Sequence, residues 1–360
     1  MSKRVLLIAN DCTTIINFRM ELLQALVSEG HIVMVALPNN ERNKEIREMG
    51  CETIPLPILR KSKNPLKDIA IIKHIISIID SCKPDIVFTF TIKPNVYGGI
   101  ACAIRHIQYI PTITGLGTSI QNGGLLQKIS LCLYRLGLKK AKSVFFQNSA
   151  NKDFMFNNAV YSGPYEMIPG SGVNLDKFHI MQFPETEEIN FIFVGRVMKD
   201  KGIEEFLAAA KYIKRIYPQC NFHIYGALEG EYESQLSKSE KTGIVVYHGM
   251  TQNMDKIYSF AHCIIHPSYH EGMANVLLEC AACGRAIITT NVPGCREAVD
   301  DGVNGYIAYV RDTHSLVEKI EQFVKLPIES KKAMGIAGRI KMEKEFDRNI
   351  VIRTYLNQVN

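Results

Sequence analysis

Short apolar runs alternate with amphipathic stretches along most of the chain. The first apolar run, Arg4–Ala9, predicts a buried strand, Asn17–Glu29 predicts an amphipathic helix, and His31–Leu37 predicts the next strand. The same alternation continues to about Ile168 and begins again at Asn190–Val194. Strands that alternate with helices in this way are typical of parallel sheets covered on both faces, so the pattern predicts an α/β fold.

A polar break divides this alternation into two parts. The stretch Met181–Asn190 lacks a helical or strand period, contains Pro184, and is predicted to be a hinge between domains. A chain of 360 residues is long enough for two hydrophobic cores. We therefore predict an N-terminal domain over residues 1–182, a C-terminal domain over 183–342 and a helical tail over 343–360.

The most informative stretch lies in the second domain, where a predicted strand leads through a loop into a helix. Cys263–His266 is the strand, His270–Ala274 the loop and Asn275–Cys283 the helix, with Asn275 expected as its N-cap. The free backbone amides at the start of such a helix form a seat for an anion, and a loop glycine lets a ligand approach the backbone. The predicted seat consists of Gly272, Met273, Ala274 and Asn275.

Two carboxylates flank this seat. Glu271 is expected on the exposed loop, and Glu279 is expected one helical turn beyond Asn275 on the same face. Carboxylates accept hydrogen bonds from sugar hydroxyls, so the stretch favours a sugar-nucleotide site whose amides bind the phosphates. Two glutamates at this spacing are also common on solvated surfaces, and it is the strand–loop–helix context that favours the site.

The same stretch resembles the donor-site signature of glycosyltransferase family four. The resemblance runs from His270–Asn275 through Glu279–Val299 to Asp301–Gly305, and three further stretches match as well. It implies the GT-B fold, in which two Rossmann-like domains face a cleft and the C-terminal helix, here 343–360, crosses back to the first domain. It also implies a hexosyltransferase that retains the anomeric configuration and binds its donor in the C-terminal domain.

The loop Gly195–Gly202 is another matching stretch. Gly195 allows a close approach to the backbone, and Arg196 and Lys201 place two cations at the end of a predicted strand. A leaving diphosphate needs its charge stabilised, and positioned cations do this in a dry cleft, so no metal and no cofactor besides the donor are expected. The alternative is that the two cations only cap the loop.

Two positions are assigned to the site by the resemblance alone. The glycine-rich loop that follows Pro111 resembles the family's interdomain loop facing the donor, which assigns Gly117 to the site. The end of the predicted strand Val245–Met250 resembles the nucleobase contact, which assigns Met250. Because that contact is made mainly by backbone, the side chains leave the identity of the base open.

The N-terminal half departs from the family pattern at two places. Thr14–Phe18 stands where many relatives have a pair of glycines, so the nucleotide is not expected to bind there. Phe88 and Phe90 stand where the family often has two histidines. Lys93 and Asn95 remain as polar groups at the carboxyl end of a strand, where open α/β sheets bind ligands.

Charge is divided unevenly between the two halves. Residues 1–182 carry 21 Lys and Arg against 13 Asp and Glu, whereas residues 183–360 carry 21 against 23. A basic half suggests an anionic partner, and basic residues gather beside apolar ones in Leu59–Lys67 and Leu125–Lys142. We expect these stretches to contact the inner membrane surface. For Leu125–Lys142 the alternative is an ordinary helix packed on the sheet, and no nucleic-acid-binding motif is present.

The location of the protein is predicted from the same features. The chain contains no apolar run of membrane-span length and no signal peptide, so we expect it in the cytoplasm, peripheral on the cytoplasmic face of the inner membrane. Asn17–Arg19 resembles the subgroup that extends polyprenyl-linked sugars. Arg19 is therefore expected either to meet an acceptor phosphate or to be a solvated residue at a helix start.

The cysteines do not change this picture. Most of the ten lie in apolar segments and are expected to be reduced core residues. Cys280 and Cys283 have the spacing of a redox or zinc pair, but no second pair follows at the distance a zinc ribbon needs. We therefore predict no metal site.

Together these features predict that a sugar, an N-acetylhexosamine or a hexose, passes from a UDP-sugar to an undecaprenyl-diphosphate-linked saccharide in surface polysaccharide or glycan assembly. Three alternatives remain open. The first is a transferase with a soluble acceptor. The second is a sugar-nucleotide epimerase of the same two-domain architecture, which needs its own acid and base histidines. The third is a module that binds a sugar nucleotide without turning it over.

Overall fold

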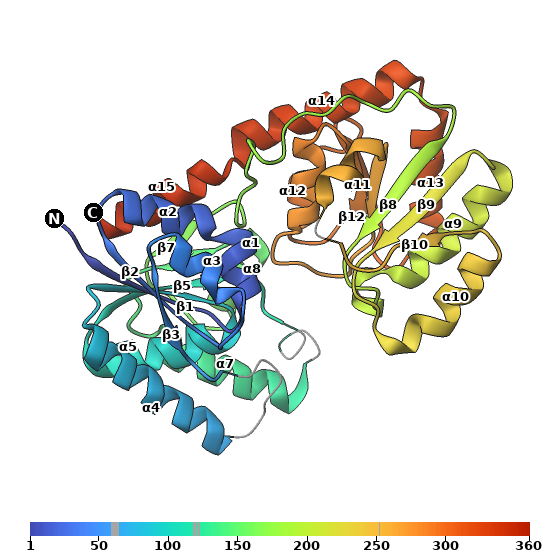
Figure 1. The fold of residues 1–360 in the computed structure, drawn as a ribbon. Helices are drawn as coiled ribbons and strands as arrows, with labels where there is room; N and C mark the ends of the chain where they lie inside the picture. Colours follow the sequence, from blue (N-terminus) through green and yellow to red (C-terminus); the bar gives the residue numbers. More distant parts are fainter. Residues whose placement is uncertain (59–64, 118–119, 121–122, 252) are drawn as a thin grey trace. The chain divides into compact units, whose positions relative to one another are not determined.

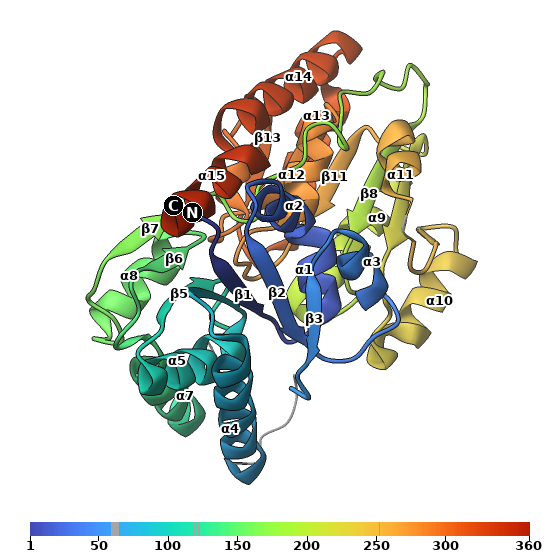
Figure 2. The ribbon, with the colours of Figure 1, turned by 60° about the vertical axis from the view of Figure 1, so that its left-hand side comes forward.

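A computed structural model describes residues 1–58, 65–117, 120, 123–251 and 253–360 of the chain. It consists of two compact units, Met1–Ser171 with Asn349–Asn360 and Gly172–Arg348. Each unit contains a parallel sheet with helices on both faces (Figures 1 and 2), so the predicted α/β fold is confirmed. The domain boundaries predicted at residues 182 and 342 stay a prediction.

The first unit is built around a sheet of seven described strands in the order β3-β2-β1-β4-β5-β6-β7, and every neighbouring pair is parallel. The apolar runs of the sequence become these strands because both faces of the sheet are covered. The strands are β1 (Arg4–Ile8), β2 (Ile32–Leu37), β3 (Glu52–Pro55), β4 (Ile86–Phe90), β5 (Gln108–Ile113), β6 (Val144–Phe146) and β7 (Tyr165–Met167).

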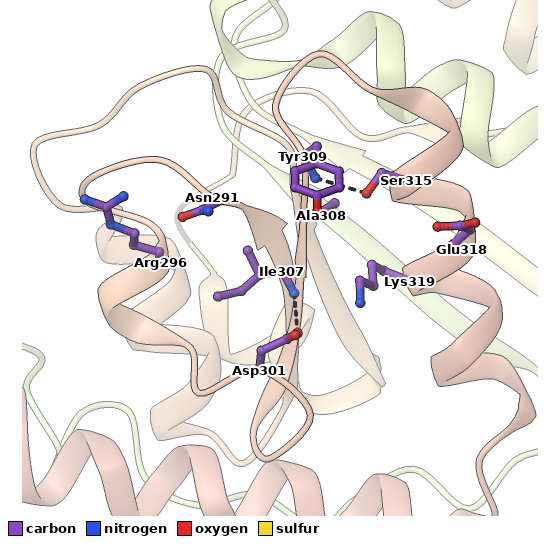
Figure 3. A pocket seen from close by; sticks show the side chains of 9 residues that line it. All are labelled: Asn291, Arg296, Asp301, Ile307, Ala308, Tyr309, Ser315, Glu318 and Lys319. Carbon is purple, nitrogen blue, oxygen red and sulfur yellow. Dashed lines mark hydrogen bonds between the residues drawn. The ribbon is translucent and has the colours of Figure 1, made fainter.

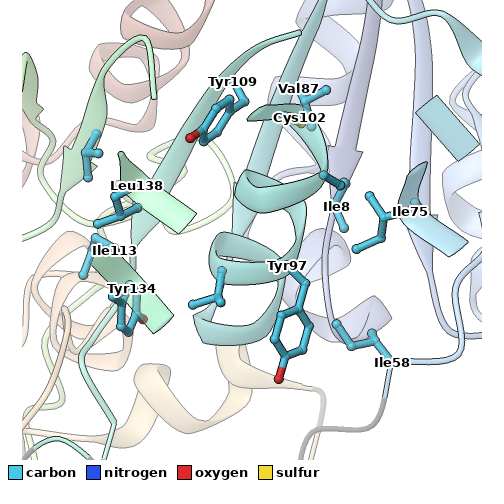
Figure 4. Close-up of a cluster of buried hydrophobic side chains, with 14 of the residues drawn as sticks. Ile8, Ile58, Ile75, Val87, Tyr97, Cys102, Tyr109, Ile113, Tyr134 and Leu138 are labelled. Atoms are coloured by element: carbon cyan, nitrogen blue, oxygen red, sulfur yellow. The ribbon is translucent and has the colours of Figure 1, made fainter. Parts of the chain in front are cut away.

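The helices of this unit form two layers. On one face α4, α5 and α7 enclose the apolar cluster that Figure 4 shows around Ile8, Ile75 and Tyr134. On the other face α1, α2, α3 and α15 cover a second cluster. The bounds are α1 (Cys12–Phe18), α2 (Met20–Ser28), α3 (Asn43–Glu48), α4 (Pro65–Cys82), the π-helix η1 (Pro94–Gly98), α5 (Gly99–Arg105), α7 (Gly124–Leu138), α8 (Ser149–Asn157) and α15 (Arg348–Val359).

The second unit repeats the plan with six described strands in the order β10-β9-β8-β11-β12-β13, again all parallel. Its strands are β8 (Ile189–Val194), β9 (Cys220–Tyr225), β10 (Val246–Tyr247), β11 (Cys263–His266), β12 (Ala286–Thr290) and β13 (Gly305–Ala308). The helical segments are η2 (Lys199–Lys201), α9 (Ile203–Ile216), η3 (Gly230–Tyr232), α10 (Glu233–Lys241), α11 (Met254–Phe260), α12 (Asn275–Ala282), η4 (Arg296–Ala298), α13 (Thr313–Lys325) and α14 (Ile328–Glu345).

A buried arginine ties the start of the second unit to its sheet. Arg285 is fully buried and donates hydrogen bonds to the carbonyl oxygens of Tyr258 at 2.8 Å, Met181 at 3.1 Å and Gln182 at 2.7 Å. A buried guanidinium needs such acceptors because its desolvation is otherwise uncompensated. Residues 181 and 182, which belong to the predicted hinge, are thereby fixed to the second unit.

Three predicted elements differ in the structure. The predicted helix Asn17–Glu29 is two helices, α1 and α2, because Arg19 between them leaves helical geometry at φ −139° and ψ 2°. The predicted helix Leu125–Lys142 ends at Leu138. Residues 59–64 of the predicted basic loop Leu59–Lys67 lie outside the described residues, and its last three residues begin α4 at Pro65.

The C-terminal helix α15 belongs to the first unit. Tyr355 is fully buried there, and its hydroxyl lies 2.7 Å from Thr112 Oγ1. Its ring makes T-shaped contacts with the rings of Phe88 and Phe145, at centroid distances of 5.1 and 5.0 Å. Arg19, which is 2% exposed, lies over the same ring with its guanidinium carbon 5.9 Å from the centroid. The solvated role predicted for Arg19 is therefore wrong, because its side chain is buried against Tyr355, and its contact with an acceptor phosphate stays a prediction.

No helix in the described part of the chain combines the length and apolar content needed to cross a bilayer.

The packing of α15 gives a first test. Tyr355→Ala is expected to lower the free energy of unfolding by about 3–5 kcal/mol, the usual loss for removing a large buried aromatic side chain. Asn357→Ala on the exposed side of the same helix is the control, with an expected change within about 0.5 kcal/mol. Urea unfolding followed by far-UV circular dichroism measures both. An unchanged midpoint for Tyr355→Ala would mean that α15 does not support the first core.

Candidate active site

The centre of the candidate site is the carboxylate of Glu271, in the loop that follows β11. Its Oε1 accepts a hydrogen bond from the ammonium of Lys201, with which it also forms an ion pair. The same oxygen lies 2.9 Å from His266 Nε2. The side chains of Glu271 and His266 are 13% and 2% exposed. The expectation of an exposed Glu271 is therefore wrong, because two cationic or donating neighbours allow the charge to be buried.

Close packing between two loops brings Lys201 to this carboxylate. Gly202 has φ +71°, and a side-chain carbon there would meet the carbonyl oxygen of Pro267 at 2.0 Å. The carbonyl of Asp200 accepts hydrogen bonds from Ser268 Oγ at 3.1 Å and from the Tyr269 amide at 3.0 Å. The loop after β8 is thus fastened to the loop after β11, and only glycine fits at the point of contact.

His266 is a site residue that the sequence interpretation did not select. It is the last residue of β11, and its ring lies 6.4 Å from that of Phe193 in a stacked arrangement. Because Nε2 faces a carboxylate, which only accepts hydrogen bonds, Nε2 carries the ring proton and donates a hydrogen bond to Glu271. A histidine that ends a buried strand five residues before the glutamate was the available signal, but an apolar strand gives no reason to choose it over a core histidine.

The protonation of Glu271 follows from these contacts. Burial raises the pKa of its carboxyl, but the Lys201 ammonium and the His266 hydrogen bond outweigh burial and hold the pKa well below its ordinary value of 4.5. The carboxylate is therefore ionised at neutral pH. None of the described residues is bonded to its second oxygen, Oε2, so this oxygen is available to a ligand.

Glu279 has a different environment on α12. Its Oε2 accepts a hydrogen bond from the hydroxyl of the fully buried Tyr258 at 3.0 Å. Burial raises its pKa to about 7, although the Tyr258 bond opposes the rise. Glu279 therefore exists in both protonation states near neutral pH, whereas Glu271 remains charged.

The stretch predicted to be an anion seat differs in detail from the prediction, and its role in binding a ligand stays a prediction. The helix begins at Asn275 with Ala274 as its N-cap, so the prediction that Asn275 is the N-cap is wrong by one residue. The Ala274 amide donates to the Gly294 carbonyl at 2.8 Å, and Met273 and Ala274 are buried at 7% and 4% exposure. Gly294, at φ +83°, packs against the carbonyl oxygen of Gly272, so a second loop holds the seat in place.

Arg196 does not join the Lys201 cluster. It follows Gly195 at the end of β8, and its Nη1 lies 3.4 Å from Oε1 of Glu229. Both side chains are nearly half exposed, and exposed ion pairs of this kind are weak. The structure thus separates the two cations that the sequence placed together: Lys201 is committed to Glu271, while Arg196 stays at the surface.

Met250 lies at the rim of a pocket of about 460 Å³ between the ends of β9 and β10 and helix α11. Met250 is 79% exposed, while the rings of Tyr225 and His248 stack in the pocket with centroids 4.4 Å apart and planes 7° from parallel. His223 Nδ1 lies 3.0 Å from His248 Nε2. Burial, and then the neighbouring His248, lowers the pKa of His223 to about 4, so the ring is neutral at physiological pH.

A second depression, of about 580 Å³, lies at the carboxyl ends of β12 and β13 (Figure 3). Side chains of both charges surround it, including Arg296, Asp301, Glu318 and Lys319, and Tyr309 stands at its upper edge. The predicted site residues do not line it.

Gly117 belongs to the first unit, and its position is described within that unit only. It has φ +74°, and a side-chain carbon there would meet Ile92 Cδ1 at 2.7 Å. Among the described residues no cluster of three or more His, Cys, Asp or Glu is placed to hold a metal ion, and the ten cysteines are free.

Family models match both parts of the chain. The model described as glycosyl transferase 4-like matches residues 4–148, and the model for glycosyl transferases group 1 matches residues 176–341. The chain is 25% identical over 371 aligned residues to the N,N'-diacetylbacillosaminyl-diphospho-undecaprenol alpha-1,3-N-acetylgalactosaminyltransferase of Campylobacter jejuni, covering 98% of this chain and 97% of the relative.

Two further proteins extend the comparison. The capsular polysaccharide biosynthesis glycosyltransferase CapM of Staphylococcus aureus is 24% identical, with 92% of this chain and 90% of CapM covered. The crystal structure of Anabaena Alr3699/HepE in complex with UDP and glucose superposes with a TM-score of 0.80 at 13% identity and covers 99% of both chains. The latter likeness concerns the fold.

The contact between His266 and Glu271 gives a test that depends on pH. His266→Phe is expected to lower the free energy of unfolding by about 1.5–3 kcal/mol at pH 7, because a hydrogen bond to a buried charge is lost. A carboxyl whose pKa is depressed by folding contributes stability above its ordinary pKa of 4.5, and this contribution is lost as the pH falls below that value. The difference between the parent protein and His266→Phe should therefore shrink between about pH 5 and pH 2.

His266→Gln is the matched control, because its side-chain amide can donate from a position close to Nε2. It should recover most of the stability at pH 7. Urea midpoints for the three proteins across this pH range measure the effect. A His266→Phe penalty that is the same at both ends of the range would rule out a bond to ionised Glu271.

Proposed function

Because the chain belongs to glycosyltransferase family four and has the GT-B fold, we propose that it transfers a sugar from a UDP-sugar to a saccharide linked to undecaprenyl diphosphate. The observation that carries the proposal is the alignment with the Campylobacter jejuni transferase, which spans nearly all of both chains. The name of that relative specifies a diphospho-undecaprenol acceptor, and Anabaena HepE was crystallised with UDP and glucose.

The site residues support transfer chemistry. Oε2 of Glu271 accepts a hydrogen bond from a hydroxyl of the donor sugar, while Lys201 and His266 keep the carboxylate ionised and oriented. The Lys201 ammonium, held at the same place, stabilises the negative charge of the leaving diphosphate. Arg196, whose ion pair with Glu229 is weak, is the second cation for that charge.

The reaction is proposed to retain the anomeric configuration without a protein nucleophile. The bond between the anomeric carbon and the phosphate oxygen breaks, and the acceptor oxygen bonds to the same face of that carbon. The acceptor proton passes to an oxygen of the departing diphosphate. No metal is required in this scheme, because Lys201, Arg196 and backbone amides at the start of α12 serve the diphosphate. The Ala274 amide is not among them, since it donates to the Gly294 carbonyl.

The remaining predicted residues are assigned to the nucleotide. Glu279 binds the ribose hydroxyls, and the pocket beside Met250, with the stacked rings of Tyr225 and His248, receives the base. Gly195 is assigned to the diphosphate, and the contact of Gly117 with the donor stays a prediction.

Turnover of a defined donor and acceptor tests the proposal. The protein is incubated with a panel of UDP- and GDP-sugars and with undecaprenyl diphosphates carrying one N-acetylhexosamine. Transfer from a UDP-sugar is expected, unchanged by EDTA, and Glu271→Gln should slow it by about 10²–10³-fold, the usual effect of removing one preorganised polar group. Glu329→Gln, whose side chain is 78% exposed at the start of α14, is the control.

Each alternative has its own result in the same assay. An epimerised UDP-sugar without transfer would identify an epimerase, and transfer to a soluble saccharide alone would exclude the lipid-linked acceptor. Donor binding without turnover of any acceptor would indicate a binding module. A strict metal requirement would overturn the metal-free scheme.

Helix α7 supports a position of the protein at the membrane surface. Along its outer side an exposed apolar stripe is formed by Leu125, Ile129 and Leu136, which are 74%, 48% and 54% exposed, with exposed Cys132 between the last two. The spacing of four, three and four residues places these side chains on one face of the helix. Lys128, Arg135 and Lys139 form an exposed basic row beside the stripe. Apolar insertion and attraction to anionic headgroups act together on such a face.

Co-sedimentation with liposomes of phosphatidylglycerol and phosphatidylethanolamine tests this surface. A variant with Leu125, Ile129 and Leu136 changed to Ser is expected to lose at least about tenfold in partition coefficient, and one with Lys139, Lys140 and Lys142 changed to Ser a similar factor. Binding of the parent should weaken as salt rises, since the Debye length falls from about 10 Å at 0.1 M to about 3 Å at 1 M.

The matched control uses Ile336 and Ile340, two exposed isoleucines on α14 that are 49% and 57% exposed. Changing both to Ser should leave liposome binding as in the parent protein. If the parent protein does not bind anionic liposomes at low salt, or if the α14 variant loses as much binding as the α7 variant, α7 is not the membrane contact.

A further inference from the structure

Tyr269 lies in the loop after β11, two residues before Glu271, and is partly exposed. Its hydroxyl donates a hydrogen bond that the two carboxylate oxygens of Glu205 share, at 2.8 and 2.9 Å. Glu205 belongs to the first turn of α9. The phenol of Tyr269 therefore joins the loop that carries Glu271 to the helix that follows Lys201.

The carboxylate of Glu205 depends on this bond. Glu205 is 9% exposed, and a carboxylate at that depth is costly unless hydrogen bonds compensate its lost hydration. Burial, and then the bond to Glu205, raises the pKa of the Tyr269 hydroxyl, so the hydroxyl keeps its proton and remains a donor. Removing the hydroxyl leaves a buried carboxylate without this donor.

A third segment closes on the ring of Tyr269. Arg311, in the loop between β13 and α13, has its guanidinium carbon 4.7 Å from the centroid of that ring, which is a cation–π contact. Its φ is +59°, a conformation that residues other than glycine adopt at a cost. Such residues persist where surrounding contacts fix them, and they gather at functional sites. A strained backbone and a buried charge thus meet at one tyrosine.

The bonds of Tyr269 to the neighbouring segment lie on both sides of Lys201. The Tyr269 amide donates to the carbonyl of Asp200 at 3.0 Å, one residue before Lys201, and its hydroxyl reaches Glu205, four residues after Lys201. One contact alone would let the two segments pivot about it, whereas two contacts fix their separation. Tyr269 therefore determines how the ammonium of Lys201 meets the carboxylate of Glu271.

We propose that Tyr269 is a positioning residue of the transfer reaction, whose hydroxyl, bonded to Glu205, holds the Glu271 carboxylate against the Lys201 ammonium. The kinetic part of this inference rests on the proposed function, whereas the coupling between Tyr269 and Glu271 does not. A misplacement of about 1 Å costs about 100-fold in rate, so the loss of this anchor reaches the chemical step through Glu271 and Lys201.

The experiment removes the Tyr269 hydroxyl and keeps the ring beneath Arg311, in the variant Tyr269→Phe. Tyr232→Phe is the matched control, because the hydroxyl of Tyr232 donates to Glu204 of the same helix at 2.9 Å, from η3 and not from the loop of the site. Each variant is also combined with Glu271→Gln. The transfer assay gives kcat and the KM for the UDP-sugar, and urea midpoints give the stability of every protein.

Tyr269→Phe is expected to lower kcat by about 10–100-fold. The KM for the UDP-sugar should change by less than about threefold, since the interaction lost acts in the transition state. In the Glu271→Gln background the same change should cost less than about twofold, because the carboxylate that Tyr269 positions is gone. Tyr232→Phe should stay within about twofold of its reference in both backgrounds.

The urea midpoints are expected to show the same coupling without any turnover. Tyr269→Phe and Glu271→Gln together should lose less than the sum of their single losses, whereas Tyr232→Phe and Glu271→Gln should add. A further variant combines Tyr269→Phe with Glu205→Gln, which removes the buried charge together with its donor. This protein folds even if Tyr269→Phe alone does not, and its kcat should fall as well.

Three results would overturn the inference. They are a parent-like kcat in the variant that combines Tyr269→Phe with Glu205→Gln, a loss from Tyr269→Phe that is equal with and without the Glu271 carboxylate, and additive midpoints for Tyr269→Phe and Glu271→Gln. The last two would assign the hydroxyl to the fold alone. The proposed function fails by a different result, a folded parent protein that transfers no sugar, and the midpoints then still decide whether Tyr269 and Glu271 are coupled.

Discussion

A buried charge sets the geometry of the second unit. Glu271 is ionised while only 13% exposed, and a carboxylate at that depth is tolerated only with close partners. Lys201 reaches it because Gly202 lets the loop after β8 press against Pro267. His266 reaches it from the end of β11, and Gly294 packs behind it. Removing any of these contacts leaves a charge or a carbonyl without its partner, so three loops depend on one carboxylate.

The sequence predicts much of this arrangement, because parallel strands and strand-to-helix loops are local patterns. The strands β1, β4, β8 and β11, and helix α12, lie where apolar runs and glycines place them. The nearness of Lys201 to Glu271 follows only from tertiary packing, and the sequence paired Lys201 with Arg196 instead. The sequence predicts a solvated Arg19 as one possibility, because helix periodicity carries no information about α15. Tyr355 of that helix, from the other end of the chain, packs on Arg19.

The errors share a physical cause. A side chain's exposure depends on which distant segment packs on it, so the sequence predicts Glu271 on an exposed loop although bonds to other segments enclose it. For the same reason the sequence does not show that Asn95, a polar residue near a strand end, is buried and bonded to Thr89 and Thr112. Backbone strain is likewise invisible in the sequence: nothing in the residue order shows that Thr91 has positive φ. His266 went unselected for the same reason, since its partner is fixed by loop packing and not by strand pattern.

In both sheets, a residue whose conformation or buried charge opposes folding lies at an equivalent position. In each sheet the first strand has on one side the strand that follows it in sequence, and on the other the strand where the winding reverses, β4 in the first unit and β11 in the second. The strained Thr91 follows β4, and the buried Glu271 follows β11. Strain and buried charge both oppose folding, and neither is needed to close the apolar cores that hold the sheets together. Stability alone therefore does not account for either residue. A requirement for ligand chemistry at the winding reversal of each unit accounts for both, since open α/β sheets bind their ligands at this place.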